Sequence, residues 1–253
     1  MLTKEELITY CAEARKNYLP HISIDCVVFG FHEGQMKVLI LKIKNGDEWY
    51  LPGGFLLKEE PIDHAANRIL KERTSLDKIF LQQFRVFGEP DRSKEHFDMY
   101  KDMLPGEANW FTNRFLTIGY YALVDFLDAN PTPDELSATC TWCDLNEVPP
   151  LRLDHTQILN AALDTLRQHL NYQPIGYNLM PKEFTMPELQ KLYETILDKK
   201  LDRRNFQRRM LGFGILNRAD EPRKGGAHKA PFLYSFNTEK YKAALTEGFN
   251  GGW

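Results

Sequence analysis

The side chains that could do chemistry are concentrated between Gly53 and Leu76, in the sequence GGFLLKEEPIDHAANRILKERTSL. This stretch predicts the end of a strand, a tight Gly-Gly turn, a short loop and then a helix. Pro61 is tolerated in a first helical turn, and the apolar residues after it recur at helical spacing. Glu72 and Arg73 place a carboxylate beside a cation, so together they bring almost no net negative charge to a metal ion.

The same stretch resembles the Nudix box, a loop-helix-loop signature written G-x5-E-x7-R-E-U-x-E-E-x-G-U, with U an aliphatic residue. In an active Nudix hydrolase, carboxylates at positions 69, 72 and 73 share one helix face and hold divalent metal against a diphosphate. Here Ile69 and Arg73 replace two of those carboxylates, and Ser75 replaces the second Gly. We therefore predict a retained scaffold that is not an enzyme, with no catalytic residue, metal ligand or cofactor. The matching positions are Gly54, Glu60, Arg68, Leu70, Glu72 and Leu76.

The composition is that of a soluble globular protein. With 253 residues, 43% hydrophobic and 26% charged, the chain is long enough for one large or two modest domains. The first 20 residues are charged and lack an apolar core of signal-peptide length, and no run approaches the ~20 apolar residues of a membrane span. We expect a cytoplasmic protein that does not associate with a membrane.

The net charge of −3 is unevenly distributed. Residues 178–253 contain 14 Lys and Arg against 9 Asp and Glu, a net charge of +5, so the first 177 residues carry −8. A basic C-terminal part joined to an acidic body indicates two modules, of which the second faces an anionic partner.

Four cysteines are too few and too scattered for a disulfide framework. Cys140 and Cys143 form a CxxC pair in a segment that predicts a strand, where an odd separation sends the two thiols to opposite faces. The sequence has no second CxxC or His pair to complete a zinc set. We therefore expect neither a metal site nor a redox role for this pair.

The chain up to residue 171 alternates apolar strand patterns with amphipathic helix patterns. Asp154 is well placed to cap a closing helix, with Gln157 three residues on, although Asp154 and His155 could instead contact a ligand. The long loop at 93–113 contains aromatic residues such as Trp110 and Phe111, which either form a stacking wall for a ligand or pack onto the sheet. We predict an N-terminal helix at 3–17, strands at 22–31, 36–44, 79–88, 114–126 and 136–145, and the closing helix at 154–170.

The C-terminal part begins after a segment rich in Pro and Gly, 172–182, which we predict to be a linker. Thr185 and Glu188 form a capping box for one helix, and Asp202 is placed to cap a second, so the pair predicts a helix-turn-helix. On the second helix Phe206, Met210 and Phe213 lie on one side, which we expect to face the core. The opposite side and its shoulders carry Arg203, Arg204, Asn205, Arg208 and Arg209, a set suited to phosphates and to base edges in a major groove.

A basic hairpin is predicted to follow this helix. GILNR and PFLYSF predict two strands, and the Gly-rich segment between them carries Arg223, Lys224, His228 and Lys229. A basic hairpin after a recognition helix is the wing of a winged helix-turn-helix, which reaches the DNA backbone or minor groove. The alternative for the arginine-rich helix is a basic surface that only faces solvent.

The pairing of a Nudix-like domain with FT-x-x-ELQ-x-LYE-x-IL-x-x-x-LDRRNF-x-R resembles the Nudix-related transcriptional regulators, the NrtR and AraR-like group. The wing departs from the expected GRPA-x-LYRF, because this chain has GAHKAPFLYSF. The resemblance implies an α/β Nudix-type α/β/α sandwich at 1–171, with its N-terminal helix within 1–20, followed by a winged helix-turn-helix domain at 183–253. It also implies a homodimer that binds an inverted-repeat operator in double-stranded DNA.

In this group a small-molecule effector in the Nudix cleft shifts the affinity for the operator. The known effectors are ADP-ribose-type nucleotides and, in the AraR-like branch, arabinose. Members of that branch have eroded boxes, as here, because a sugar without a diphosphate needs no metal cluster. The resemblance therefore favours a sugar or related polar metabolite over a nucleotide. An active Nudix hydrolase, with Glu60 and Glu72 as residual metal ligands, is the competing class, and a basic domain that contacts protein is a third. We place the effector beside the box helix, near Glu60, Arg68, Glu72, Asp91 and Arg92.

Overall fold

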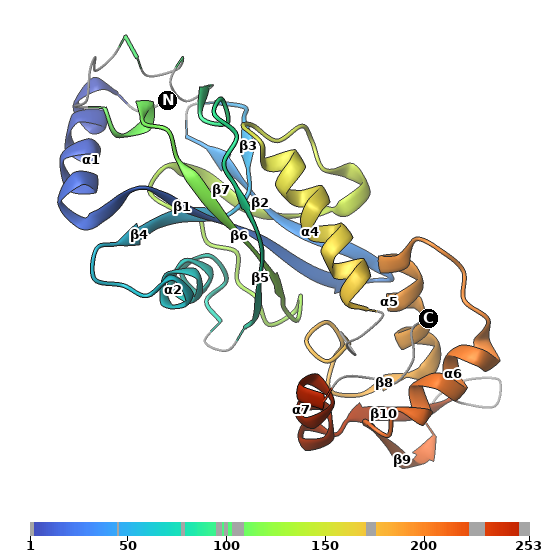
Figure 1. Cartoon of the computed structure of the whole chain (residues 1–253). Coiled ribbons are helices and arrows are strands. Elements are labelled where there is room, and N and C mark those ends of the chain that lie inside the picture. The colour runs from blue at the N-terminus through green and yellow to red at the C-terminus, as the bar shows by residue number, and fades with distance from the viewer. Residues whose placement is uncertain are drawn as a thin grey trace. The chain divides into compact units, whose positions relative to one another are not determined.

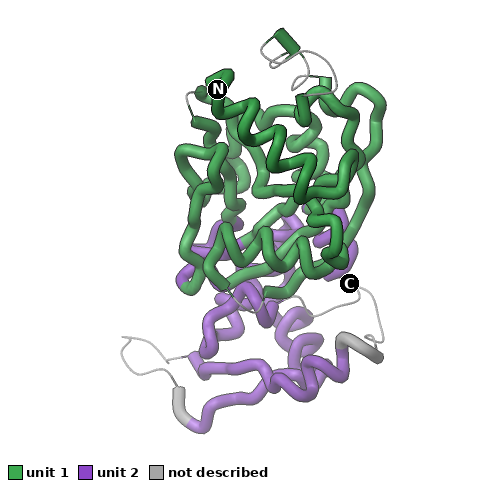
Figure 2. Tube along the Cα trace, turned by 90° about the vertical axis from the view of Figure 1, so that its left-hand side faces the viewer, with its two compact units in different colours: residues 1–29, 37–124, 128–162 green, residues 30–36, 125–127, 163–253 purple. Residues whose placement is uncertain are grey.

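A computed structural model gives the fold of the chain (Figure 1). Contacts between Cα atoms divide the chain into two compact units, drawn in green and purple in Figure 2. Unit 1 comprises residues 1–29, 37–124 and 128–162, and unit 2 comprises residues 30–36, 125–127 and 163–253. No helix in the described part of the chain is both long and apolar enough to cross a membrane. The structure describes residues 3–44, 46–76, 79–94, 98, 101–102, 109–170, 176–222 and 231–247.

A seven-stranded mixed sheet is the centre of the larger fold. Its main path runs β3-β2-β1-β6-β5, with β4 paired to β1 and β7 paired to β2. The pair β1–β6 is parallel, whereas β4–β1, β7–β2 and β5–β6 are antiparallel. The strands are β1 (Tyr18–His32), β2 (Gln35–Ile43), β3 (Trp49–Tyr50), β4 (Gly53–Leu57), β5 (Phe80–Phe87), β6 (Leu116–Leu123) and β7 (Ser137–Asp144).

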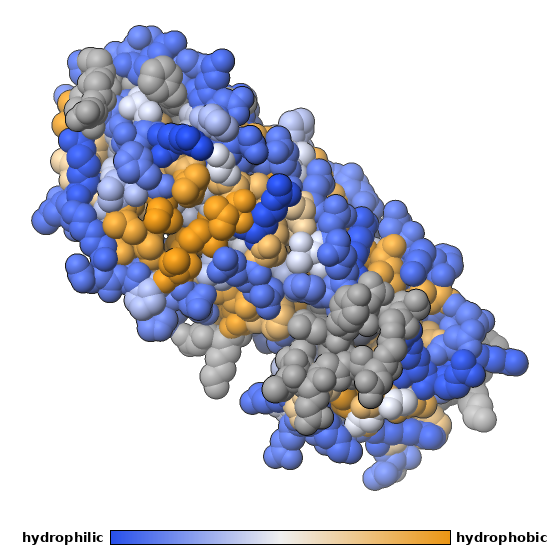
Figure 3. Space-filling model, in the orientation of Figure 1, coloured by the Kyte–Doolittle hydropathy of each residue, from blue (hydrophilic) through white to orange (hydrophobic). Residues whose placement is uncertain are grey.

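Helices cover this sheet, and Figure 1 shows its strands between α2 and α4. Alternate residues of β1, from Ile24 to Val28, point to one face and pack against the buried side of α2, which includes Ala65 and Ile69. On the face shown in Figure 3, the part of the surface over this sheet carries a patch of apolar side chains with hydrophilic residues around it. The helices are α1 (Lys4–Asn17), α2 (Ile62–Thr74), α4 (His155–His169) and the short 3-10 helices η2 (Trp110–Thr112) and η3 (Leu145–Glu147).

The predicted helices and strands of this domain are confirmed, mostly within a few residues at each end. The Gly-Gly turn is not, because Gly53 and Gly54 lie within β4 and pair with Asp25 and Ile24 of β1. A Cβ on Gly53 would lie 2.5 Å from Asp25 Oδ1, and one on Gly54 would lie 2.9 Å from Ile69 Cδ1. The two glycines are therefore required for close packing rather than for a change of chain direction.

The aromatic residues of the 93–113 loop that the structure describes pack inward. Trp110 and Phe111 are buried in a cluster with Leu7, Cys11 and Ala14 of α1. Phe97 and Tyr100 lie outside the described residues. Packing is thus the role of Trp110, while Phe111 also borders a cavity in the same domain.

The CxxC pair lies on β7. Both thiols are free, and Cys140 is buried in the core cluster, whereas Cys143 is only half-buried. Burial raises the pKa of Cys140 to about 11 and also raises the pKa of Cys143, so both remain thiols at neutral pH.

The C-terminal residues form a winged helix. Helix α5 (Met186–Leu197) begins with the predicted capping box, in which the Thr185 hydroxyl accepts from the Glu188 N–H and Glu188 accepts from the Thr185 N–H. The Asp202 carboxylate caps α6 (Arg203–Gly212) by accepting from the Asn205 N–H at 2.9 Å. A sheet of order β8-β10-β9 and a last helix complete the fold. These elements are β8 (Phe184–Thr185), β9 (Leu216–Pro222), β10 (Phe232–Phe236) and α7 (Thr238–Glu247).

The predicted core face of α6 is confirmed in part. Phe206 and Met210 are buried, and the Phe206 ring packs edge-on against Tyr193 of α5 with centroids 5.4 Å apart. Phe213 was expected with them, but it is the C-cap residue and only half-buried. The Arg209 guanidinium lies over its ring, 5.7 Å from the centroid. Because α6 ends at Gly212, the helical spacing that predicted a core position no longer applies at Phe213.

Candidate functional site

Unit 1 contains a cavity of about 540 Å³, within the range that holds small-molecule ligands. Its wall comes from α1, from β1 to β4, from α2, from the loop after β5, from the segments before β6 and β7, and from the start of α4. The charged lining residues are Asp25, Arg68, Glu72, Arg73, Arg92, Asp134 and Glu135, and the aromatic ones are Tyr10, Tyr18, Tyr50, Phe55, Phe111 and Phe115.

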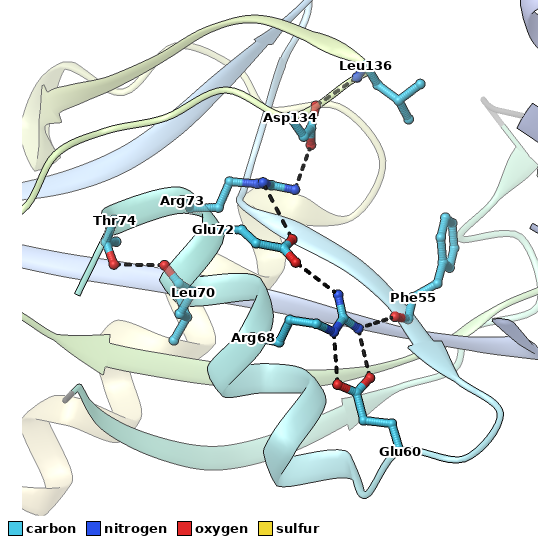
Figure 4. Close-up of polar contacts among 9 residues, drawn as sticks. All are labelled: Phe55, Glu60, Arg68, Leu70, Glu72, Arg73, Thr74, Asp134 and Leu136. Carbon is cyan, nitrogen blue, oxygen red and sulfur yellow. Dashed lines mark hydrogen bonds and ion pairs between the residues drawn. The ribbon is translucent and has the colours of Figure 1, made fainter. Parts of the chain in front are cut away.

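Arg68 connects the box helix to the loop before it (Figure 4). Its Nε and one terminal nitrogen donate to the two carboxylate oxygens of Glu60, each at 2.8 Å, and it also donates to the Phe55 carbonyl at 3.0 Å. The hydrogen bond from Arg68 holds the pKa of Glu60 below its usual value. Glu60 is not among the residues that line the cavity, whereas Arg68 is. The pair is therefore a bidentate clamp that orders the box, with one side of Arg68 facing the cavity.

Glu72, the one carboxylate left on the metal-binding face, lies between two cations. It contacts Arg68 at 3.5 Å and Arg73 at 3.9 Å, and Arg73 in turn pairs with Asp134 at 3.3 Å. Figure 4 shows these four side chains as a chain of alternating charge along one side of α2. Ile69, on the same face, is buried against Gly54. Within the described residues no cluster of three or more His, Cys, Asp or Glu side chains could hold a metal ion.

A second polar cluster is buried at the cavity around Arg92. Arg92 donates to both oxygens of Asp154, each at 2.9 Å, and one of its terminal nitrogens lies 3.3 Å from Asp25 Oδ2. Asp154 stands just before α4 and its carbonyl accepts from the Ile158 N–H, which is the cap position. Its carboxylate, expected to cap the helix or contact a ligand, is instead engaged by Arg92. Asp91, the neighbour predicted with Arg92, is exposed and does not line the cavity.

His155 adds a neutral group to this cluster. The Leu51 N–H donates to His155 Nδ1 at 2.9 Å, so Nδ1 carries no proton and the ring holds its proton on Nε2. Nε2 lies 3.6 Å from Asp25 Oδ1. One carboxylate oxygen of Asp25 thus accepts a hydrogen bond from Arg92, and the other lies towards His155.

His155 was named in the sequence as a possible ligand contact and does line the cavity, whereas nothing was predicted for Asp25 or for the tyrosines of the cavity. A signal for Asp25 was present, since it is the one charged residue in the apolar strand pattern ISIDCVVFGF. A carboxylate inside a buried strand needs a partner, which here is Arg92. Tyr10 and Tyr18 gave no comparable signal, because their partners come from distant parts of the chain.

The predicted DNA-binding residues of α6 lie together on its solvent side. Arg203, Arg204, Asn205 and Arg208 are exposed, and Arg209 is half-buried. Arg208 donates to the Asn205 side chain at 3.0 Å, which orients both groups on the same surface. The predicted wing residues Arg223, Lys224 and Lys229, with His228, lie outside the described residues.

A Nudix-type α/β/α domain with an eroded box, followed by a winged helix, defines a class of DNA-binding proteins built on an enzyme fold. The Nudix domain family matches residues 19–162, and the NrtR DNA-binding winged helix domain matches residues 176–236. The chain therefore belongs to the Nudix family and carries an NrtR winged helix domain.

The relatives agree with this assignment. The ADPR responsive transcriptional repressor NtrR of Acinetobacter baylyi is 29% identical over 229 residues, 88% of this chain and 84% of the relative. The crystal structure of Shewanella oneidensis NrtR has a TM-score of 0.72 at 24% identity, covering 92% of this chain and all of that one. The same protein complexed with a 27mer DNA has a TM-score of 0.69 at 24% identity, with 87% and 95% covered. At this identity the structural matches establish the fold.

Proposed function

We propose that this protein is a transcriptional repressor that binds operator DNA through α6 and its wing, and that an ADP-ribose-type nucleotide in the Nudix cavity lowers its affinity for DNA. The relative named as an ADPR responsive repressor is the observation that carries the proposal, because it matches along both domains. The exposed Arg203, Arg204, Asn205 and Arg208 of α6 supply the chemistry for a major groove.

The proposal includes the finer points that the resemblance implied. The protein acts as a cytoplasmic homodimer on an inverted repeat, with domains at 1–171 and 183–253 joined by 172–182. A nucleotide fits the cavity, because aromatic side chains suited to a base and arginines suited to phosphate line the same space. A sugar such as arabinose, the other effector class, could form hydrogen bonds with the same carboxylates and arginines, but it has no phosphate group to pair with the arginines.

A hydrolase is the less favoured function. Metal-assisted diphosphate cleavage needs several carboxylates on the box helix, and here Glu72 is shared between Arg68 and Arg73 while Ile69 is buried. The cavity, together with the alternating charges of Arg68, Glu72, Arg73 and Asp134 beside it, favours binding of a nucleotide without its cleavage.

The test begins with selection of the operator from a random duplex library, followed by fluorescence-anisotropy titration of the selected duplex. We expect the full-length protein to prefer this duplex over a scrambled one by at least about 10³-fold. ADP-ribose should weaken that binding, and arabinose should leave it unchanged. Equal affinity for selected and scrambled duplex would contradict the repressor function, and a response to arabinose alone would assign the effector to the sugar class.

A further inference from the structure

The N-terminal segment lies before the part of the chain that matches the Nudix family, which begins at residue 19. Two of its residues, Tyr10 in α1 and Tyr18 at the start of β1, nevertheless line the cavity. The cavity of this protein is therefore built in part by a segment outside that match.

The segment is held firmly against the domain. Helix α1 begins with a capping box between Thr3 and Glu6. Its side facing the domain buries Leu7, Cys11 and Ala14 against Trp110 and Phe111, and the Trp110 N–H donates to Cys11 Sγ at 3.3 Å. This packing fixes the position of the tyrosines, since Tyr10 lies on the same side of α1, Tyr18 directly follows the helix, and both pack against this cluster.

Tyr10 offers a flat ring and an available hydroxyl. Its ring is stacked on Phe111, with centroids 5.2 Å apart and planes at 17°. Among the described residues its hydroxyl has no hydrogen-bond partner, although the side chain is half-buried at the cavity. Burial raises the pKa of Tyr10, and the nearby Tyr18 and Asp134 raise it further, so the hydroxyl remains a donor at neutral pH.

Tyr18 repeats this arrangement nearer the box helix. Its ring packs against Phe55 at 5.5 Å and Trp110 at 6.3 Å. Its hydroxyl also has no partner within the described part of the chain, and Arg68 and Glu72 are among the charges that act on it. The cavity thus carries two aromatic rings with unused hydroxyls from one segment, beside the charged side of the box helix.

We propose that residues 4–18 form the wall that recognises the flat heteroaromatic ring of the effector, with Tyr10 and Phe111 contacting the ring and the hydroxyls of Tyr10 and Tyr18 donating to its acceptor atoms. The ligand class is a nucleotide with a purine-type base, whose phosphates lie towards Arg68 and Arg73. The inference rests on the proposed function, since it deepens the role of the same cavity. It assigns recognition of the base to Tyr10 and Tyr18, which lie outside the Nudix match, together with Phe111, while the phosphates face the box helix.

Calorimetric titration of the full-length protein with ADP-ribose tests the wall. Tyr10→Phe keeps the stacked ring and removes only the hydroxyl, and Phe111→Leu removes the flat face. Each should weaken ADP-ribose binding by about three- to tenfold, the effect of a lost hydrogen bond or ring contact. Tyr177→Phe is the matched control, because Tyr177 is exposed and lies outside the cavity. Melting curves should be alike for Tyr10→Phe, Tyr177→Phe and the parent.

Saturation-transfer NMR on the parent provides a readout specific for the base. We expect the adenine H2 and H8 protons of ADP-ribose to receive the most saturation, and Tyr10→Phe to reduce it. Unchanged affinity in both cavity variants, or strongest transfer to the terminal ribose, would overturn the inference while leaving the effector function intact. A parent protein that does not bind ADP-ribose would instead refute the nucleotide effector itself, and the base-recognition wall with it.

Discussion

Arg92 and Asp154, 62 residues apart in the chain, are joined by two hydrogen bonds of 2.9 Å inside the Nudix domain. The same guanidinium lies 3.3 Å from Asp25, so one cation serves two buried carboxylates. His155 is neutral in this arrangement, which leaves the cluster with a net charge of −1. The cluster thereby joins three segments at the edge of the cavity: the middle of β1, the loop after β5 and the start of α4.

Removing Arg92 should therefore be costly for folding. Arg92→Ala leaves Asp25 and Asp154 buried without a cation, and the expected loss is about 3–5 kcal/mol in the free energy of unfolding. Urea denaturation of the full-length protein measures it. Lys94→Ala, which removes an exposed cation from the same loop, should change stability by less than about 0.5 kcal/mol. Equal stability of the two variants would show that the buried cluster does not hold the domain.

The box should not support catalysis. With Glu72 between Arg68 and Arg73, we expect no turnover of ADP-ribose in the presence of Mg²⁺ or Mn²⁺ when products are followed by chromatography. Turnover at an ordinary enzyme rate, on the order of 1 per second or faster, would contradict this.

The double substitution Ile69→Glu/Arg73→Glu is the counterpart, because it returns three carboxylates to one helix face. Calorimetry should show Mn²⁺ binding to this variant and not to the parent. The structure adds a cost that the sequence did not show, since Ile69 is buried against Gly54 and a Glu there must turn towards the cavity. A folded double variant with no affinity for Mn²⁺ would show that this protein has lost the metal-binding geometry of the box as well as its carboxylates.

The clamp between Glu60 and Arg68 should make stability depend on pH. The hydrogen bond from Arg68 lowers the pKa of Glu60 below its usual 4.5. A depressed carboxyl pKa contributes stability above the unfolded-state value, and this is lost as pH falls through the folded-state value. Glu60→Gln should thus be less stable than the parent at pH 7, with the difference shrinking below about pH 4.5.

Urea midpoints measured from pH 7 to pH 3.5 test this clamp. Glu59→Gln is the control, because Glu59 is exposed and should show a constant difference from the parent. A Glu60→Gln difference that stays equal at both ends of the range would mean that the carboxylate contributes nothing through its charge.

Local patterns predicted most of the fold, and their limits are physical. The caps of α5 and α6 are determined within four residues, so the sequence specified them correctly. Gly53 and Gly54 were expected in a turn, because local sequence cannot distinguish a glycine that bends the chain from one that another strand or helix approaches closely. Phe213 continued the apolar spacing of α6 past the residue where the helix ends.

The cavity was predicted less completely than the fold. The charged residues of the box helix were found because they lie within one short stretch. Asp25, His155, Tyr10 and Tyr18 come from β1, α4 and α1, and only the tertiary fold brings them to one space. Asp91 and Arg92 are adjacent in the sequence but differ in role, since one is exposed and the other is buried with two carboxylates.

The two sides of α6 make opposite demands on substitutions. Arg204 and Arg208 are exposed, so the double variant Arg204→Ala/Arg208→Ala should fold within about 0.5 kcal/mol of the parent. Affinity for the selected operator should fall by about 1–3 kcal/mol for each Arg that reads a base. Phe206→Ala should do the reverse, costing about 3–5 kcal/mol of domain stability, because Phe206 fills the space beside Tyr193.

Anisotropy titrations at two salt concentrations, beside melting curves, distinguish the ways in which the arginines act. An Arg that contacts phosphate reduces the slope of log affinity against log salt by about 0.9 when it is removed, whereas one that reads only a base leaves the slope unchanged. Lys240→Ala/Lys242→Ala removes the same charge from α7 and controls for the general field of the domain. If the α6 variant binds operator as tightly as this control, the arginine face of α6 is a solvated surface, and operator recognition must come from another part of the winged helix.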